Sequence, residues 1–194
     1  MTRLGFAEHR DVYDALRAAY SEAHRFYHTT EHISHCLQQL DDVAERAGSL
    51  EDVETALWFH DAVYAPRSQS NERDSAEWAS DFLRLAGAGE ARCAKVREHI
   101  IATEHNAAPT DPDAALVVDI DLTILGSAPE AYQVFETNIR QEYKWVPAPL
   151  YRRKRKEVLG SFLARPSIYG TDHFRDRYES AARANLRAAI QALA

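Results

Sequence analysis

The sequence predicts an all-α fold, a helical bundle formed by a single domain over residues 1–194. Ala, Leu, Arg and Glu dominate the chain, whereas Gly and Pro together number only fourteen, and this composition favours helix over sheet. Apolar residues recur at spacings of three and four along most of the chain, as on the buried side of amphipathic helices. An apolar content of 45% is sufficient for one core at this length.

The charge and the apolar pattern exclude several classes of partner. The net charge of −7 and the pI near 5.7 give no overall attraction to nucleic acid or anionic membranes. No apolar run approaches the roughly 18 residues that span a bilayer, and the N-terminus lacks the pattern of a signal peptide. We therefore expect a cytoplasmic protein that binds a small molecule, with a homodimer left open. Cys36 and Cys93 lack C-x-x-C spacing and are expected to be buried thiols without a disulfide.

The first two helices are expected over residues 7–23 and 29–48. The first repeats apolar residues at helical spacing and serves packing. A Thr-Thr pair caps the second, whose first turn carries His32, and His28 lies just before it. A capped first turn holds a ligand rigidly, although capping or surface exposure alone would also explain either histidine.

The next helix begins at a Ser49-x-x-Asp52 capping box and ends in His60-Asp61. The helical period places on one side Val53, Leu57, His60, Asp61 and Tyr64. A buried histidine and aspartate are costly unless something pairs with both. A divalent metal would do so, since the two side chains supply a nitrogen and an oxygen ligand from one turn. A local hydrogen bond or salt bridge is the alternative.

A loop over residues 65–70 leaves directly from this proposed site, because proline and serines interrupt the helical pattern. Two further helices are expected over residues 71–87 and 90–103. Glu72 lies in the first turn of the former, where the helix dipole alone would favour an acid. His105 follows the latter, where a histidine often only satisfies the last carbonyls.

Asp111-Pro112 is a strong start signal for a helix through Gly126. In a helix, Asp121 points inward among branched apolar residues and requires a partner, which an ion held by His60-Asp61 would provide. If residues 117–120 form a short strand instead, Asp119 is the better candidate. Periodicity does not decide between the two.

The last third of the chain predicts three helices. The first begins at a Ser127-x-x-Glu130 capping box and ends near Tyr143. The second carries the basic run 151–156, which is typical of a solvated helix face, although an arginine fork also binds phosphate. Thr171 caps the third.

Taken together, His32, His60, Asp61 and one acid of the pair Asp119 and Asp121 give two imidazoles and two carboxylates from three helices. Mixed nitrogen and oxygen ligation suits a divalent Mn, Fe, Co, Ni, Zn or Mg ion, and the sequence does not choose among them.

At these residues the chain resembles the HD superfamily of metal-dependent phosphohydrolases, and most closely the branch described as predicted metal-dependent HD phosphohydrolases. The shared motifs cover nearly the whole chain. They are Tyr27-His28-x-x-x-His32, Phe59-His60-Asp61-x-Val63-Tyr64, Asn71-Glu72-x-x-Ser75, Thr103-x-His105, Asp119-x-Asp121-Leu122-x-x-Leu125-Gly126, Arg140-x-Glu142-Tyr143, Arg155-x-x-Val158-Leu159 and Glu179-x-x-Ala182-Arg183-x-Asn185-Leu186.

The resemblance implies an all-helical HD-type fold and hydrolysis of a small phosphorylated compound, often a nucleotide. It implies that His32, His60, Asp61 and Asp121 bind the metal, with Asp119 as the alternate fourth ligand. His28, Glu72 and His105 match motifs of the branch without a transferable role, and we expect them in the substrate pocket or around the ligands.

The expected mechanism follows from the charge of the ion, which lowers the pKa of bound water and polarises a phosphoryl oxygen. Asp61 would orient the water, Arg140 and Arg155 would bind the phosphate oxygens, and His105 or His28 would protonate the leaving oxygen. Two other functions stay open. One is a non-catalytic nucleotide- or metal-binding module, and the other is a di-iron oxygenase on a similar cage, which would need further ligands such as His28, Glu72 or His105.

Overall fold

In the computed structural model, which describes residues 9–193, the protein is all-α. Nine α-helices, two 3-10 helices and no strand occur in this range. The described chain divides into two compact units, one ending at Asp121 and the other beginning at Leu122. The all-α prediction is therefore confirmed, and the single domain over residues 1–194 stays a prediction.

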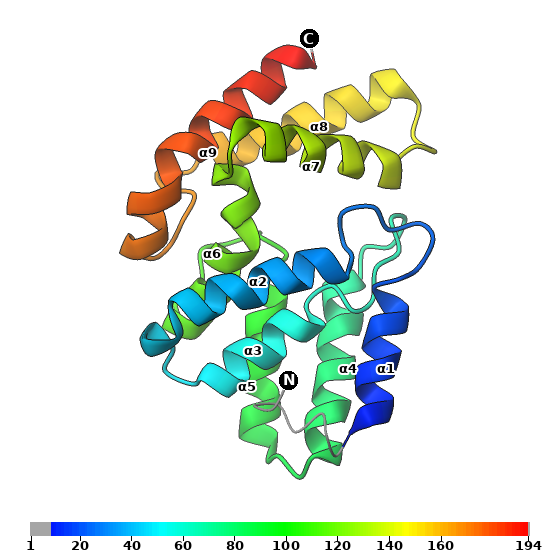
Figure 1. The fold of residues 1–194 in the computed structure, drawn as a ribbon, viewed down its shortest axis with the longest axis vertical. Helices are drawn as coiled ribbons and strands as arrows, with labels where there is room; N and C mark the ends of the chain where they lie inside the picture. The colour runs from blue at the N-terminus through cyan, green and yellow to red at the C-terminus, as the bar shows by residue number, and fades with distance from the viewer. Residues whose placement is uncertain (1–8, 194) are drawn as a thin grey trace. The chain divides into compact units, whose positions relative to one another are not determined.

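The first unit is built from six α-helices that pack around α3 and α5 (Figure 1). Its elements are α1 Arg10–Ala19, α2 Thr30–Asp42, the 3-10 helix η1 Ala44–Arg46, α3 Leu50–Phe59, α4 Asn71–Leu85, α5 Glu90–Ala102 and α6 Pro112–Asp121. In α3 every residue from Asp52 to Phe59 is buried, because α2, α4, α5 and α6 all contact it. A helix enclosed on all sides gives a fixed position to the residues that follow it.

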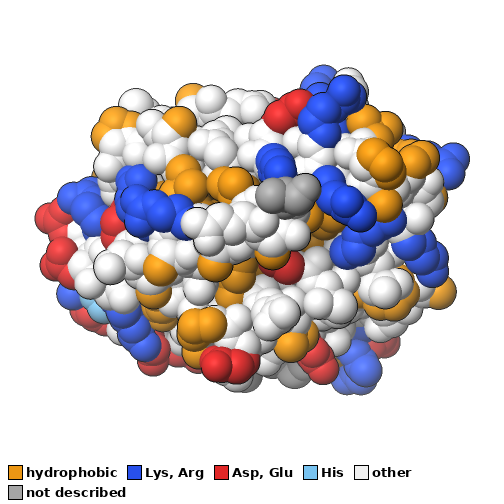
Figure 2. Space-filling view, turned by 90° about the horizontal axis from the view of Figure 1, so that it is seen from above, with side chains coloured by type: hydrophobic (Ala, Val, Ile, Leu, Met, Phe, Trp, Pro, Cys, Tyr) orange, Lys and Arg blue, Asp and Glu red, His pale blue; other side chains and the backbone are white. Residues whose placement is uncertain are grey.

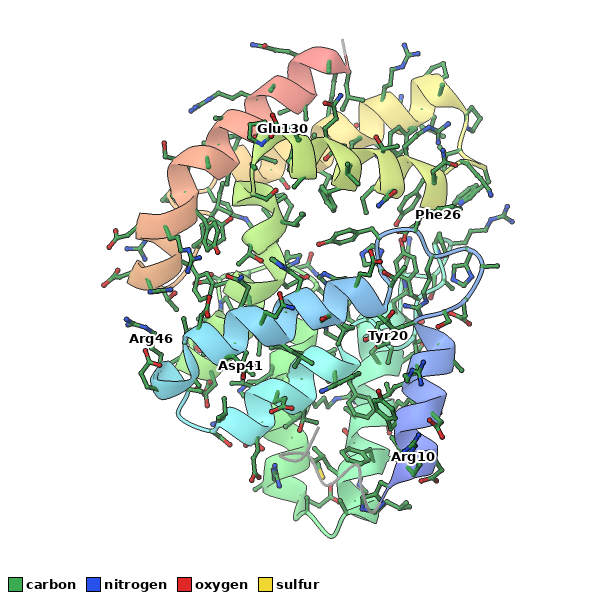
Figure 3. All side chains as sticks on the ribbon, viewed as in Figure 1. Arg10, Tyr20, Phe26, Asp41, Arg46 and Glu130 are labelled. Carbon is green, nitrogen blue, oxygen red and sulfur yellow. The ribbon has the colours of Figure 1, made fainter. Side chains whose placement is uncertain are left out.

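Aromatic and cationic side chains hold the end of α3 in place. Tyr20, labelled in Figure 3, is fully buried and donates its hydroxyl proton to the carbonyl of Trp58 at 2.9 Å. Phe59 stacks on Phe82, with ring centroids 5.4 Å apart. Arg25 is only 6% exposed and lies over the Tyr20 ring, 5.2 Å from its centroid. The turn after α3 is therefore braced from the side of α1.

The predicted capping box at the start of α3 is absent. Ser49 precedes α3 but makes no capping hydrogen bond with its side chain, and the carboxylate of Asp52 instead accepts from Arg92 at 2.6 Å. The amides of Gly48 and Ser49 donate to Asp113, at 2.7 and 2.9 Å. A carboxylate distant in sequence has thus replaced the local cap.

The segment that could have been a strand is helix. Residues 112–121 form α6, and Asp111 caps it by accepting from the amides of Asp113 and Ala114 at 2.9 and 3.0 Å. The expected helix at residues 29–48 is shorter, because α2 ends at Asp42. At its start Thr29 is the N-cap and accepts from Glu31.

The second unit contains η2 Leu122–Gly126, α7 Pro129–Glu142, α8 Ala148–Leu163 and α9 Asp172–Ala192. η2 lies against α9 so closely that a Cβ added at Gly126 would be 2.7 Å from the Cβ of Tyr178. Asn185 donates to the carbonyls of Leu125 and Ser127, both at 2.9 Å. These contacts join the start of this unit to its last helix.

The capping predictions for the second unit hold only in part, since Thr171 is the N-cap of α9 but its side chain makes no capping hydrogen bond. Ala128, not Ser127, is the N-cap of α7, and no side chain bonds to it, so the predicted capping box is absent. Ser127 instead donates to the carbonyl of Ile124 at 2.8 Å. α8 begins at Ala148, because Pro149 fits the first helical turn, where no amide proton is needed.

Two further expectations concern the cysteines and membrane-spanning helices. Cys36 and Cys93 are buried and free, as predicted. Within residues 9–193, none of the helices has both the length and the apolar character needed to cross a bilayer.

Candidate metal centre

Four side chains from three segments of the first unit converge at the end of α3. His32 lies in the first turn of α2, His60 is the C-cap of α3 and Asp61 follows it, while Asp121 is the last residue of α6. The Nε2 atoms of the two histidines are 3.1 Å apart. From His32 Nε2, Asp61 Oδ2 lies at 3.5 Å and Asp121 Oδ1 at 3.3 Å. From His60 Nε2 the same two oxygens lie at 3.0 and 3.5 Å.

These separations fit a single cation. Ligands about 2.1 Å from an ion, at angles between octahedral and tetrahedral, lie roughly 3.0 to 3.4 Å from one another. Two imidazole nitrogens and two carboxylate oxygens are also a suitable donor set for the first-row divalent metals. The spacing of the two histidines from each other and from each carboxylate therefore fits a divalent metal, as does the chemistry of the donors. One group whose donor atoms are close enough to share an ion is His32, His60 and Asp61.

Hydrogen bonds to groups outside the cluster orient the side chains of His60 and Asp121. His60 Nδ1 lies 2.9 Å from the carbonyl of Leu57, which can only accept, so Nδ1 donates a proton there and Nε2 is the nitrogen that faces the cluster. Asp121 Oδ2 lies 3.1 Å from His105 Nε2, which leaves Oδ1 toward the histidines. Such outer partners are a regular feature of metal-binding histidines and carboxylates.

The cluster is also strongly coupled electrostatically. Burial opposes charge on His60, but the carboxylates of Asp61 and Asp121 overcome it and raise the pKa of His60 well above its usual value. Burial likewise opposes charge on Asp61, yet His60 and His28 hold its pKa below the usual range. Asp121 behaves in the same way, with its pKa lowered by His105 and His32 against the effect of burial. Both carboxylates are thus ionised and able to bind a cation.

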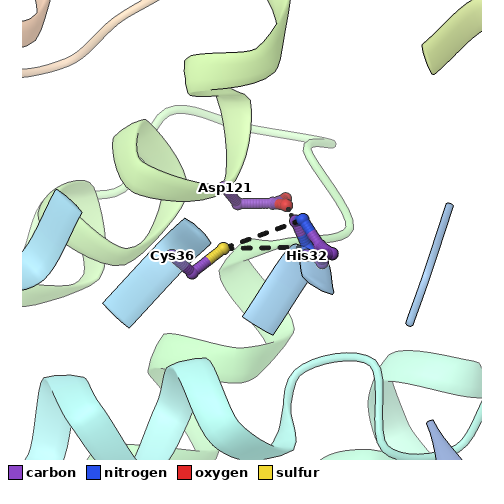
Figure 4. A group of neighbouring side chains, drawn as sticks. All are labelled: His32, Cys36 and Asp121. Carbon is purple, nitrogen blue, oxygen red and sulfur yellow. Dashed lines mark hydrogen bonds and ion pairs between the residues drawn. The ribbon is translucent and has the colours of Figure 1, made fainter. Parts of the chain in front are cut away.

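Figure 4 shows a further sulfur beside this cluster. Cys36 follows His32 by one helical turn, and its Sγ lies 3.7 Å from Nε2 and 3.8 Å from Nδ1 of that ring. His32, Cys36 and Asp121 form a second group whose donor atoms are close enough to share an ion. Burial and the charges of Asp121 and Asp61 raise the pKa of the Cys36 thiol. The sequence predicts Cys36 only as a buried thiol, although its i, i+4 spacing from His32 places the two side chains on one face of a helix.

Comparison with known proteins gave no match: neither a family model, nor a curated protein, nor a solved structure resembles the chain. The resemblance to the HD superfamily therefore stays a prediction.

The structure separates the two candidate acids of α6. Asp119 is fully buried, and among residues 9–193 the groups that could hold a metal contain Asp121 and not Asp119. Residues two apart in a helix point roughly 200° apart, so only one of them can face the cluster. Because α6 remains helical to Asp121, that residue is the one placed beside His32 and His60.

Three other candidates from the sequence lie near the ligands. The ring of His28 is 6.1 Å from that of His32 and 4.3 Å from that of Tyr64, between centroids. His105 contacts Asp121 directly and has a positive φ of 57°. Glu72 is half-buried, and burial raises its pKa, with Asp61 and His105 among the charges that act on it.

Arg140 and Arg155 belong to the second unit and are occupied by partners there. Arg155 makes a two-pronged ion pair with Glu136, from Nε at 3.1 Å and Nη2 at 2.5 Å. Arg140 donates to the carbonyls of Tyr143 and Val146. Their predicted role in binding phosphate stays a prediction.

Arg25 is a residue of the site that the sequence pattern does not predict. Its guanidinium donates to the carbonyl of Asp61 at 2.7 Å, to that of Ala62 at 3.0 Å and to that of His28 at 3.3 Å. One buried cation thus joins the segment before α2 to the turn after α3. Every residue has a backbone carbonyl, so the sequence does not indicate which carbonyls a buried arginine will bind.

Proposed function

We propose that this protein is a metal-dependent phosphohydrolase that acts on small phosphorylated compounds, with nucleotides as one substrate class. The observation that carries the proposal is the cluster of His32, His60, Asp61 and Asp121, in which the two histidine Nε2 atoms lie 3.1 Å apart and each carboxylate has an oxygen 3.0 to 3.5 Å from both of them. A divalent cation held there supplies positive charge next to a phosphoryl oxygen and makes coordinated water more acidic.

The exposure of the four side chains supports access from one side. Those of His32 and His60 are 1% exposed, whereas those of Asp61 and Asp121 are 17% and 16% exposed. The histidines thus form the closed floor of the site, and the carboxylates border its open side. Water and a phosphate ester would enter beside the carboxylates, where Asp61 is able to orient a water molecule by accepting its hydrogen bond.

Two neighbouring histidines have separate roles in this proposal. His105 makes a hydrogen bond with Asp121 Oδ2 and so positions that carboxylate. His28 is ionisable, lies beside His32 and Tyr64, and is the better candidate to donate a proton to the leaving oxygen. A proton donor of this kind contributes typically 10²- to 10⁴-fold to the rate.

The test is a screen of phosphomonoesters, phosphodiesters and nucleotides against a panel of divalent metals, run on the wild type and on Asp61→Ala. We expect Asp61→Ala to lose both the bound metal and the activity while it keeps its helical circular dichroism. Asp41→Ala, on the exposed end of α2 (Figure 3), is the matched control and should keep both.

Three outcomes would reject the proposal. Metal-dependent turnover retained by Asp61→Ala would reject the site. Tight nucleotide binding without turnover under any metal would indicate that the protein is a non-catalytic binding module. Two irons per chain with visible absorption would point to oxygen chemistry.

A further inference from the structure

A groove in the second unit lies outside the candidate metal centre. It has a volume of about 600 Å³ and is formed by α7, α8 and α9. One face of α7 lines it from Pro129 to Gln141, a length of roughly 18 Å at the rise of an α-helix. Small and apolar residues of α9 form much of the opposite wall, among them Ala188, Ala189 and Ala192. Binding sites for small molecules typically have this size and this mostly apolar lining.

Most polar groups along the groove already have partners within the unit. The carboxylate of Glu136 accepts from Arg155 and from the hydroxyl of Tyr132. The amide of Asn185 donates twice to the carbonyls described above. Arg140 donates to two carbonyls and lies over the ring of Tyr151, 4.6 Å from its centroid. These groups have little capacity left for a ligand.

Unlike these groups, Tyr151 and Arg152 keep capacity for hydrogen bonds to a ligand. Tyr151 is only 8% exposed and lines the groove, yet its buried hydroxyl has no hydrogen-bond partner within residues 9–193. A buried hydroxyl without a partner costs free energy. The neighbouring Arg152 also lines the groove and is exposed. The groups that remain for a ligand are therefore this hydroxyl and guanidinium, together with the side-chain amides of Gln133 and Gln141, which also line the groove.

The charge of the second unit also favours a negatively charged ligand. Residues 122–194 contain 12 Lys and Arg but only 7 Asp and Glu, so this unit is basic within an acidic protein. Figure 2 shows Lys and Arg side chains standing among hydrophobic ones on one face of the surface. A hydroxyl and a guanidinium match the two oxygens of a carboxylate, and the long apolar walls match an unbranched chain.

We propose that the groove between α7, α8 and α9 binds a free medium-chain fatty carboxylate, with its head group at Tyr151 and Arg152 and its chain along the alanines of α9. This site is separate from the proposed phosphohydrolase centre and does not depend on it.

The experiment is a fluorescence titration of the full-length protein with anilinonaphthalenesulfonate, followed by displacement with dodecanoate below its micellar concentration. We expect saturable binding at one site per chain, displaced by dodecanoate and not by the cationic dodecyltrimethylammonium. Ala189→Trp fills the groove and should weaken dodecanoate binding at least about tenfold. The control Ala184→Trp, on the exposed face of the same helix, should not.

Two polar variants test the head-group site without altering the walls. Arg152→Gln should weaken dodecanoate about fivefold, and Tyr151→Phe by a similar factor. The control Arg153→Gln removes the same charge from the next residue, which does not line the groove, and should have no effect. Equal weakening by Arg152→Gln and Arg153→Gln would overturn the proposal. Unchanged dodecanoate binding in a folded Ala189→Trp protein would also overturn it, as would equal displacement of the dye by dodecanoate and by dodecyltrimethylammonium.

Discussion

Replacing the two acids of α6 one at a time provides the sharpest test of the metal centre. Asp121→Asn keeps the size of the side chain but removes the charge beside His32 and His60, whereas Asp119→Asn makes the same change two residues away. Asp121 Oδ1 lies 3.3 Å from His32 Nε2, and Asp119 is fully buried outside the groups that could hold a metal. We expect only Asp121→Asn to lose metal-dependent stabilisation.

The magnitude follows from linkage between binding and folding. A metal present at 100 times its dissociation constant stabilises the wild type by about 2.7 kcal/mol. If losing one charged ligand weakens binding about 100-fold, the same metal concentration stabilises Asp121→Asn by only about 0.4 kcal/mol. For a chain of this length the melting temperature should rise by about 8 °C in the wild type and about 1 °C in the variant.

The assay is thermal unfolding followed by circular dichroism, with each protein measured in a chelator and then with the divalent ion that shifts the wild type most. The shift is compared within each variant, so a loss of stability in the chelator does not affect the result. Asp119→Asn should keep the shift of about 8 °C. A full shift in Asp121→Asn, or its loss in Asp119→Asn alone, would refute the assignment of the fourth ligand.

Three other predictions follow from single contacts. His105→Phe removes the partner of Asp121 Oδ2 and should weaken metal binding about 10- to 100-fold in calorimetry without abolishing it; unchanged affinity would exclude a positioning role. Gly126→Ala would place a methyl group 2.7 Å from the Tyr178 Cβ and should cost about 1–3 kcal/mol in denaturant unfolding. Burial holds the pKa of His99 below its usual 6.5, so the folded state binds this proton less well than the unfolded state, and stability should fall as the pH drops below about 6.5. His99→Gln should flatten that fall, and an unchanged pH profile would contradict it.

Helical periodicity was sufficient for the all-α fold and for the position of two candidate ligands. The spacing of apolar residues placed His60 and Asp61 together at the end of a buried helix, and α3 has this form. Periodicity did not decide between Asp119 and Asp121, because a short apolar run fits a strand or a helix equally well. The choice came from α6 continuing as helix to Asp121.

The features that the sequence did not provide all depend on contacts between distant segments. The amide of Ser49 is bonded to Asp113, 64 residues later, so the local capping rule failed there. Arg25 reaches the carbonyl of Asp61 across 36 residues. Cys36 is the exception, since its distance of one helical turn from His32 was visible in the sequence.

The arrangement of the four ligands has a consequence for substrate binding. The two nearly buried histidines face inward, and the two more exposed carboxylates border the open side. Without a cation, an approaching phosphate would therefore meet two ionised acids, and like charges at such distances repel by several kcal/mol when partly desolvated. A bound divalent ion would neutralise the two carboxylates and offer a positive centre to a phosphoryl oxygen. Under the proposed function the metal is thus required for the phosphate to bind at all, and an inert phosphate analogue should bind to the metal-loaded protein and not to the protein in chelator.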